Sequence, residues 1–224
     1  MTSLLIKFYW KDLRSRTEYI TQVYQLCGVP YEFFWVETSE FPKPKIYEKV
    51  DNFPNLPMVI FPDGKVISET LAIIQNVALK HKPELMGKTI DDQVQVTMLV
   101  GIITEIYEDF GLKIYVPCWE KAVPEALKGK WAKKLGYIAK HLAGRTTLVG
   151  DYYTAADVYL NYALEYGMAV DKALNVNAFD YSVFEKFLTA YRSIPAIKAH
   201  YESEKRPKLY ILTLPGLLRL PEMS

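Results

Sequence analysis

The hydrophobic pattern at the start of the chain alternates between strand and helix periods. Leu4 to Tyr9 is an apolar, partly alternating run that ends in aromatics, and it predicts a strand. Apolar residues at helical spacing over Leu13 to Leu26 predict a helix, which Gly28-Val29-Pro30 ends. Tyr31 to Val36, mainly aromatic with a β-branched end, predicts a second strand.

A hairpin and a helix follow a proline-containing stretch. Thr38 to Lys45 holds two prolines and is predicted to be a loop. Met58 to Phe61 and Val66-Ile67 flank the turn Pro62-Asp63-Gly64-Lys65, in which Asp-Gly is a strong hairpin signal. From Thr70 on, apolar residues recur at helical spacing. A strand–helix–strand unit followed by a hairpin and a helix predicts a compact, thioredoxin-like mixed sheet.

The second half of the chain carries helical patterns and almost no strand signal. Lys80 to Lys88 is polar and contains a proline, which indicates a linker between domains. The predicted domains are an α/β thioredoxin-like domain at 1–82 and an all-helical domain at 90–224. The helical stretches are Asp91–Tyr115, Glu120–Leu142, Thr154–Val170, Tyr181–Tyr191 and Pro195–Glu204.

One helix start has a specific local signal. Thr154-Ala155-Ala156-Asp157 follows Gly150-Asp151 and precedes an apolar run. The Thr154 side chain can cap a free N–H group while Asp157 reaches back to the cap residue. Taken alone, this capping box is a structural feature.

Composition narrows the functional classes. The chain has 224 residues, and 27 basic and 26 acidic side chains give a net charge of +1, which favours neither nucleic acid nor an anionic membrane as partner. No apolar run approaches the ~18 residues that span a bilayer, and the start of the chain lacks a signal-peptide pattern. The only cysteines, Cys27 and Cys118, have no metal-ligand spacing, and two lone cysteines suit a reducing cytoplasm. We therefore expect a cytoplasmic protein without a metal site.

The segment Phe53-Pro54-Asn55-Leu56-Pro57 precedes the third predicted strand. A cis bond between Leu56 and Pro57 would turn the chain sharply and expose backbone groups of Leu56 for pairing with an extended peptide ligand. The alternative is a trans proline at a strand entrance, which the local sequence by itself favours. Both remain open at this point.

A second candidate feature lies where the last predicted strand gives way to a helix. In Ile67-Ser68-Glu69-Thr70, Thr70 can cap the helix, whose first N–H groups carry a positive dipole and suit a carboxylate. Glu69 can hold an ammonium group. Together they could bind an α-amino acid head group, although an ordinary Thr cap beside a solvated Glu is the alternative.

These motifs together resemble those of cytosolic glutathione S-transferases. The family pattern is Leu-Pro, a strand, Asp-Gly, then Gln-Ser or Glu-Ser followed by x-Ala-Ile, which Glu69-Thr70-Leu71-Ala72-Ile73 matches closely. Tyr9-Trp10 and Asp12-Leu13-Arg14 are similar to the start of the mu class, with one residue inserted at Lys11. The resemblance is closest to the mu class, with the sigma class next, and it implies the glutathione S-transferase fold and a homodimer.

The resemblance implies a catalytic tyrosine. Tyr9 matches the residue whose hydroxyl donates to the sulfur of glutathione, the co-substrate; no permanently bound cofactor is implied. A thiol pKa near ~8.5 leaves the sulfur mostly protonated at neutral pH, and a hydrogen bond that favours the thiolate lowers that pKa. The thiolate is then the nucleophile. Trp10 is the alternative if the insertion falls elsewhere.

The resemblance also assigns further residues around the sulfur. Leu56 would pair its backbone with the cysteinyl part of glutathione, Glu69 and Thr70 would hold the γ-glutamyl part, and Lys43 or Lys45 the glycyl carboxylate. Glu105 would reach the γ-glutamyl ammonium bound by the partner subunit. The other implied residues are Trp10, Arg14, Asn55 and Pro57 as glutathione contacts, Leu13 and Tyr115 in the electrophile pocket, and Phe53 as the aromatic key of the dimer.

The implied activity is conjugation of glutathione to hydrophobic electrophiles, a detoxifying transferase reaction. Two alternatives stay open: a glutathione-dependent isomerase similar to sigma-class prostaglandin D synthase, and a non-catalytic protein that binds glutathione or other ligands. The sequence does not identify the electrophile.

Overall fold

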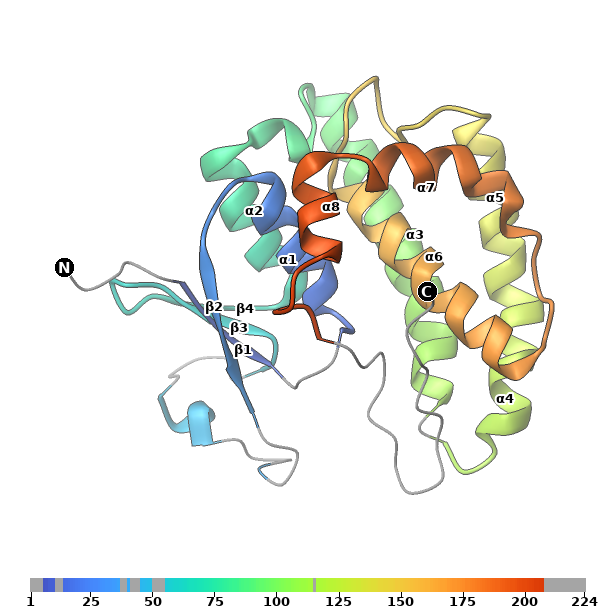
Figure 1. Cartoon of the computed structure of the whole chain (residues 1–224), viewed down its shortest axis with the longest axis horizontal. Coiled ribbons are helices and arrows are strands. Elements are labelled where there is room, and N and C mark those ends of the chain that lie inside the picture. The colour runs from blue at the N-terminus through green and yellow to red at the C-terminus, as the bar shows by residue number, and fades with distance from the viewer. Residues whose placement is uncertain are drawn as a thin grey trace. The chain divides into compact units, whose positions relative to one another are not determined.

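The computed structural model describes residues 6–10, 14–36, 40, 45–49, 55–114 and 116–207, with the backbone alone for 6–10, Trp35 and Lys49 (Figure 1). The described residues form two compact units. One comprises the residues up to Pro83 together with those from Ala196 on, and the other comprises Glu84–Pro195. The predicted helical domain, 90–224, would instead include the segment that follows Ala196.

The first unit is built on a four-stranded mixed sheet in the order β2-β1-β3-β4. β1 and β2 run parallel, whereas β3 is antiparallel to both β1 and β4. α1 connects the parallel strands and packs against α2, which follows β4. This is the predicted thioredoxin-like arrangement, and it is confirmed. The elements are β1 (Ile6–Trp10), α1 (Thr17–Leu26), β2 (Tyr31–Trp35), a 3-10 turn (Lys45–Lys49), β3 (Met58–Ile60), β4 (Val66–Ser68) and α2 (Thr70–His81).

The predicted hairpin between β3 and β4 is present. The N–H of Phe61 donates to the carbonyl of Lys65 at 2.8 Å, and that of Gly64 donates to the carbonyl of Phe61 at 2.9 Å. Gly64 has φ 85°, a backbone conformation that glycine adopts without steric cost. The Asp63 carboxylate accepts from the Lys65 N–H at 3.0 Å. The turn residues therefore supply the conformation and the hydrogen bonds that fix the register of the two strands.

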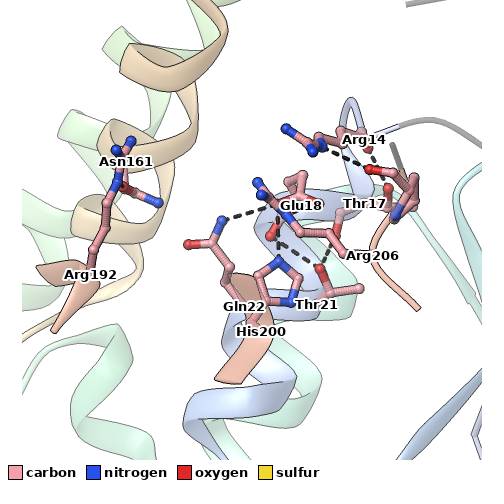
Figure 2. Close-up of polar contacts among 10 residues, drawn as sticks. Arg14, Thr17, Glu18, Thr21, Gln22, Asn161, Arg192, His200 and Arg206 are labelled. Carbon is pink, nitrogen blue, oxygen red and sulfur yellow. Dashed lines mark hydrogen bonds and ion pairs between the residues drawn. The ribbon is translucent and has the colours of Figure 1, made fainter. Parts of the chain in front are cut away.

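A buried ionic cluster attaches α8 (Pro195–Tyr201) and the segment after it to α1 (Figure 2). Glu18, with 1% of its surface exposed, accepts from His200 Nε2 at 3.0 Å. Arg206 donates to the same carboxylate through Nε, at 3.1 Å, and Nη2, at 3.0 Å. Nearby, Arg14 Nε donates to the carbonyl of Pro207 at 2.8 Å. These bonds join residues from opposite ends of the chain within the first unit.

The second unit is helical, and among the described residues no helix is long and apolar enough to span a membrane. The single helix predicted over Glu120–Leu142 is interrupted by a π-helical turn, Leu127–Trp131. Arg192 Nε donates to Asn161 Oδ1 at 3.1 Å and so links α7 to α6 (Figure 2). The helices are α3 (Ile90–Lys113), α4 (Trp119–Ala126), α5 (Ala132–Leu142), α6 (Ala155–Leu174) and α7 (Glu185–Arg192), with 3-10 turns at Pro83–Met86 and Tyr181–Phe184.

The predicted capping interaction opens α6, the central helix of this unit. Asp157 Oδ2 accepts from the N–H of Thr154 at 2.7 Å and from its hydroxyl at 2.9 Å. Its Oδ1 accepts from the N–H of Leu148 at 2.8 Å, so one carboxylate also holds the preceding loop. Burial raises the pKa of Asp157 to about 6 despite these hydrogen bonds.

Candidate functional site

Strand register brings three predicted segments to one end of the sheet. Tyr9 of β1 lies opposite Met58 of β3, and Met58 lies opposite Ser68 of β4. Pro57 immediately precedes Met58, and Glu69 immediately follows Ser68. Because facing residues in a ladder are about 5 Å apart, the backbone of Tyr9, the Leu56–Pro57 bend and the start of α2 lie close together.

The peptide bond between Leu56 and Pro57 is cis. The structure thereby decides between the two alternatives that the sequence left open. The Leu56 side chain is buried in a small apolar cluster with Val36, Ile46 and Met58. Its side chain therefore anchors the bend in the core.

Polar contacts connect this bend to the neighbouring elements. The Leu56 N–H donates to Asn55 Oδ1 at 2.9 Å, and Asn55 Nδ2 donates to Glu69 Oε1 at 2.9 Å. Tyr47, in the 3-10 turn, packs against the Leu56 cluster. Burial raises the pKa of the Tyr47 hydroxyl, while a hydrogen bond from the Leu56 backbone opposes that shift. No pattern in the proline-rich stretch before it singles out Tyr47, so sequence reasoning missed it.

Glu69 occupies the junction between β4 and α2 in an unusual conformation. Its φ of 70° and ψ of 123° lie in a region that non-glycine residues rarely adopt, and such strain is concentrated at functional sites. Its carbonyl accepts the first helical bond, from the N–H of Ile73 at 3.0 Å. The cap position is therefore Glu69, and the expectation that Thr70 caps α2 is wrong: Thr70 is the first helical residue. The helix still begins here, so its N-terminal dipole points to the same place.

Two other residues predicted to contact glutathione, Arg14 and Lys45, form hydrogen bonds within the chain. Arg14 is buried, and its Nε bond goes to Pro207. Lys45 begins the 3-10 turn with an exposed side chain, and its backbone N–H donates to Glu40 Oε2 at 3.1 Å. Their contacts with glutathione stay predictions.

Several predicted residues lie beyond what the structure describes. Leu13, Lys43, Phe53 and Tyr115 fall outside the described residues. For Tyr9 and Trp10 the backbone is described and the side chains are not. The roles of these side chains stay predictions, and within the described residues no group of His, Cys, Asp or Glu could hold a metal ion.

Glu105 lies on α3 in the second unit. It forms an ion pair with Lys130 at 2.6 Å, and its Oε2 is 3.9 Å from Lys134. The hydrogen bond from Lys130 and the charges of both lysines lower the pKa of Glu105. Its carboxylate is therefore kept ionised on an exposed helix face, and its predicted role toward a partner subunit stays a prediction.

Comparison with known proteins agrees with this arrangement. The family model "Glutathione S-transferase, C-terminal domain" matches residues 103–203. The "Glutathione S-transferase class-mu 28 kDa isozyme" of Schistosoma bovis is 30% identical over 182 residues, which cover 77% of this chain and 83% of that protein. The isozyme of the same name from Schistosoma mansoni is 29% identical over 180 residues, covering 75% and 81%.

Similarity to solved structures extends over almost the whole chain. The structure described as "rat hPGDS complexed with a quinoline" superposes with a TM-score of 0.79 and 22% identity, covering 92% of this chain and 99% of that one. A glutathione S-transferase from Ascaris lumbricoides superposes with a TM-score of 0.73 and 22% identity, covering 92% and 100%. At this identity the likeness shows the fold, which is the one that the motifs predict.

Proposed function

Because this chain belongs to the cytosolic glutathione S-transferase family, we propose that it is an enzyme that binds glutathione, activates its thiol and conjugates it to hydrophobic electrophiles. The observation that carries this proposal is the strand register. It aligns Tyr9, the cis Leu56–Pro57 bend and the Glu69–Thr70 helix start in one row across the sheet. A tripeptide in extended form could then contact all three segments.

Each part of glutathione has a partner of suitable chemistry in this row. The γ-glutamyl carboxylate is placed at the N-terminus of α2, where N–H groups and the helix dipole favour an anion. The Glu69 carboxylate offers a charge-assisted contact to the ammonium group. The Leu56 carbonyl accepts from the cysteinyl N–H, as in a strand pairing. The cysteinyl sulfur is then directed toward the Tyr9 end of β1.

The chemistry requires only that the thiol be ionised and held. The Tyr9 hydroxyl donates a hydrogen bond to the sulfur, which stabilises the thiolate and lowers the thiol pKa. With an aryl halide, the sulfur forms the new S–C bond, the halide leaves with the bonding electrons, and the thiol proton passes to solvent. Burial of the electrophile's apolar surface contributes to its binding.

We further propose that the protein is a homodimer. Exposed apolar side chains form a stripe along α3: Ile90 is 78% exposed, Val94 62% and Met98 52%. Helical spacing continues this stripe through Gly101 to Glu105, so the residue predicted to reach the partner's glutathione lies on the same face. Neither Cys27 nor Cys118 forms a disulfide, as is usual in a reducing compartment, and this supports the proposed cytoplasmic location.

The test is a conjugation assay with glutathione and 1-chloro-2,4-dinitrobenzene. We expect turnover by the native protein and a kcat/KM about 10- to 100-fold lower for Tyr9→Phe, since one hydrogen bond to a charged group is lost. Tyr137→Phe, an exposed tyrosine on α5, is the matched control and should keep native activity. If the native protein binds glutathione without turnover, the enzyme proposal is wrong. If Tyr9→Phe equals the native protein, only the assignment of Tyr9 fails.

A further inference from the structure

The Asn55 side chain bridges two parts of the site that come from different elements. Its Oδ1 accepts from the N–H of Leu56, at the cis bend, and its Nδ2 donates to Oε1 of Glu69, at the start of α2; both distances are 2.9 Å. The two bonded residues are separated by the whole β3–β4 hairpin. A side-chain amide accepts at its oxygen and donates at its nitrogen, whereas a carboxylate of the same shape lacks the donor and an alkyl group lacks both.

The exposed Glu69 side chain depends on such a hydrogen bond to fix its rotamer, whereas packing fixes the rotamer of a buried residue. Its side chain is exposed, so packing does not select a rotamer, and a flexible glutamate loses conformational freedom when it binds a ligand. The Asn55 amide holds one carboxylate oxygen. Among the described residues no other hydrogen bond to the Glu69 carboxylate is present, so its second oxygen remains available to a donor.

We infer that Asn55 is a positioning residue, which sets the Glu69 carboxylate at a fixed place relative to the Leu56–Pro57 bend before the ligand arrives. This inference rests on the proposed function and goes further, since it gives Asn55 a role through Glu69 rather than as a ligand contact. A Glu69 carboxylate held in this way should make the protein selective for ligands that carry the free α-ammonium group of a γ-glutamyl residue. A ligand without that group gains nothing from a positioned Glu69.

The test compares two ligands by isothermal titration calorimetry. They are glutathione and glutaryl-cysteinylglycine, which lacks only the α-amino group. We expect Asn55→Ala to raise the Kd for glutathione about fivefold to tenfold and to leave the Kd for the analogue within about twofold. In a Glu69→Ala background, Asn55→Ala should have no further effect on glutathione, because a residue that acts through Glu69 has nothing left to position.

Two further variants make the result decisive. Asn55→Asp keeps the acceptor but loses the donor and places a like charge near Glu69, so it should weaken glutathione binding at least as much as Asn55→Ala. Asp63→Ala also removes a side-chain bond to a backbone N–H, but in the distant hairpin turn, and it should bind both ligands as the native protein does.

The outcomes separate this inference from the proposed function. If Asn55→Ala binds glutathione as tightly as the native protein, or loses both ligands equally, Asn55 does not act through Glu69 and the inference is wrong while the proposed function stands. If the native protein binds neither ligand, the proposed function fails first and the inference fails with it.

Discussion

Glu18 shows how a single buried charge can hold two distant parts of the chain together. Burial by itself would raise the pKa of this carboxyl, but the charges of His200 and Arg206 and their hydrogen bonds outweigh it and lower the pKa well below its usual range. The carboxylate is therefore ionised throughout the physiological range. Its stabilising contribution is present above the pKa of an unfolded glutamate and is lost only as the pH falls toward the lowered folded pKa.

Substitution of Glu18 should destabilise the first unit strongly. In Glu18→Gln, Arg206 remains buried beside a neutral side chain, so we expect a loss of about 3 kcal/mol in the free energy of unfolding. Urea denaturation followed by circular dichroism measures it. Glu202→Gln is the control, because Glu202 is exposed and 3.9 Å from Lys198, and it should cost less than about 0.5 kcal/mol. Equal effects of the two substitutions would contradict the importance of the buried pair.

At the scale of elements, the close contact between α6 and the π-helical turn depends on a glycine in α6, Gly167. A Cβ at Gly167 of α6 would lie 2.2 Å from Trp131 Cζ2, which no real contact permits. Trp131 is fully buried, and its Nε1 donates to the Tyr181 hydroxyl at 3.0 Å, so the ring has little freedom to move. Gly167 is therefore required by close packing, although glycine inside a helix is otherwise unfavourable.

Gly167→Ala should lower the free energy of unfolding by about 2 kcal/mol, because the added methyl overpacks a rigid core. The thermal midpoint should fall accordingly. Gly136→Ala in α5 is the matched control: nothing lies within 4 Å of its Cβ position. That substitution should stabilise the helix by up to about 1 kcal/mol. Differential scanning calorimetry measures the thermal stability of both variants. If Gly167→Ala leaves the stability unchanged, Trp131 can move aside and the packing argument is wrong.

At the scale of the whole molecule, the proposed dimer gives the apolar stripe of α3 a function. Val94→Lys places a charge in the middle of that stripe, where an interface core disfavours it. We expect a shift from dimer to monomer in size-exclusion chromatography with light scattering. Val183→Lys alters another exposed valine, which is 50% exposed on the Tyr181–Phe184 turn, and should leave the dimer intact. A native protein that elutes as a monomer would refute the dimer proposal.

The sequence by itself determined the features that depend on neighbours along the chain. The order of strands and helices in the first unit, the Asp63-Gly64 hairpin and the bond from Thr154 to Asp157 all follow from local periodicity and turn chemistry, and the structure confirms them. Local rules failed at α2, where Thr70 looked like the cap and Glu69 holds that position in a strained conformation. Residue propensities do not predict a positive φ for a glutamate at this position.

Only the tertiary structure decided which distant residues meet. Neither the pairing of Glu18 with His200 and Arg206 nor the bridge from Asn55 to Glu69 follows from spacing, because each depends on how the chain returns on itself. The same holds for the cis state of Leu56–Pro57, which the local sequence disfavours and the folded unit selects. The motifs thus identified the family and its candidate residues, while the strand register placed the backbone segments of the site in one row.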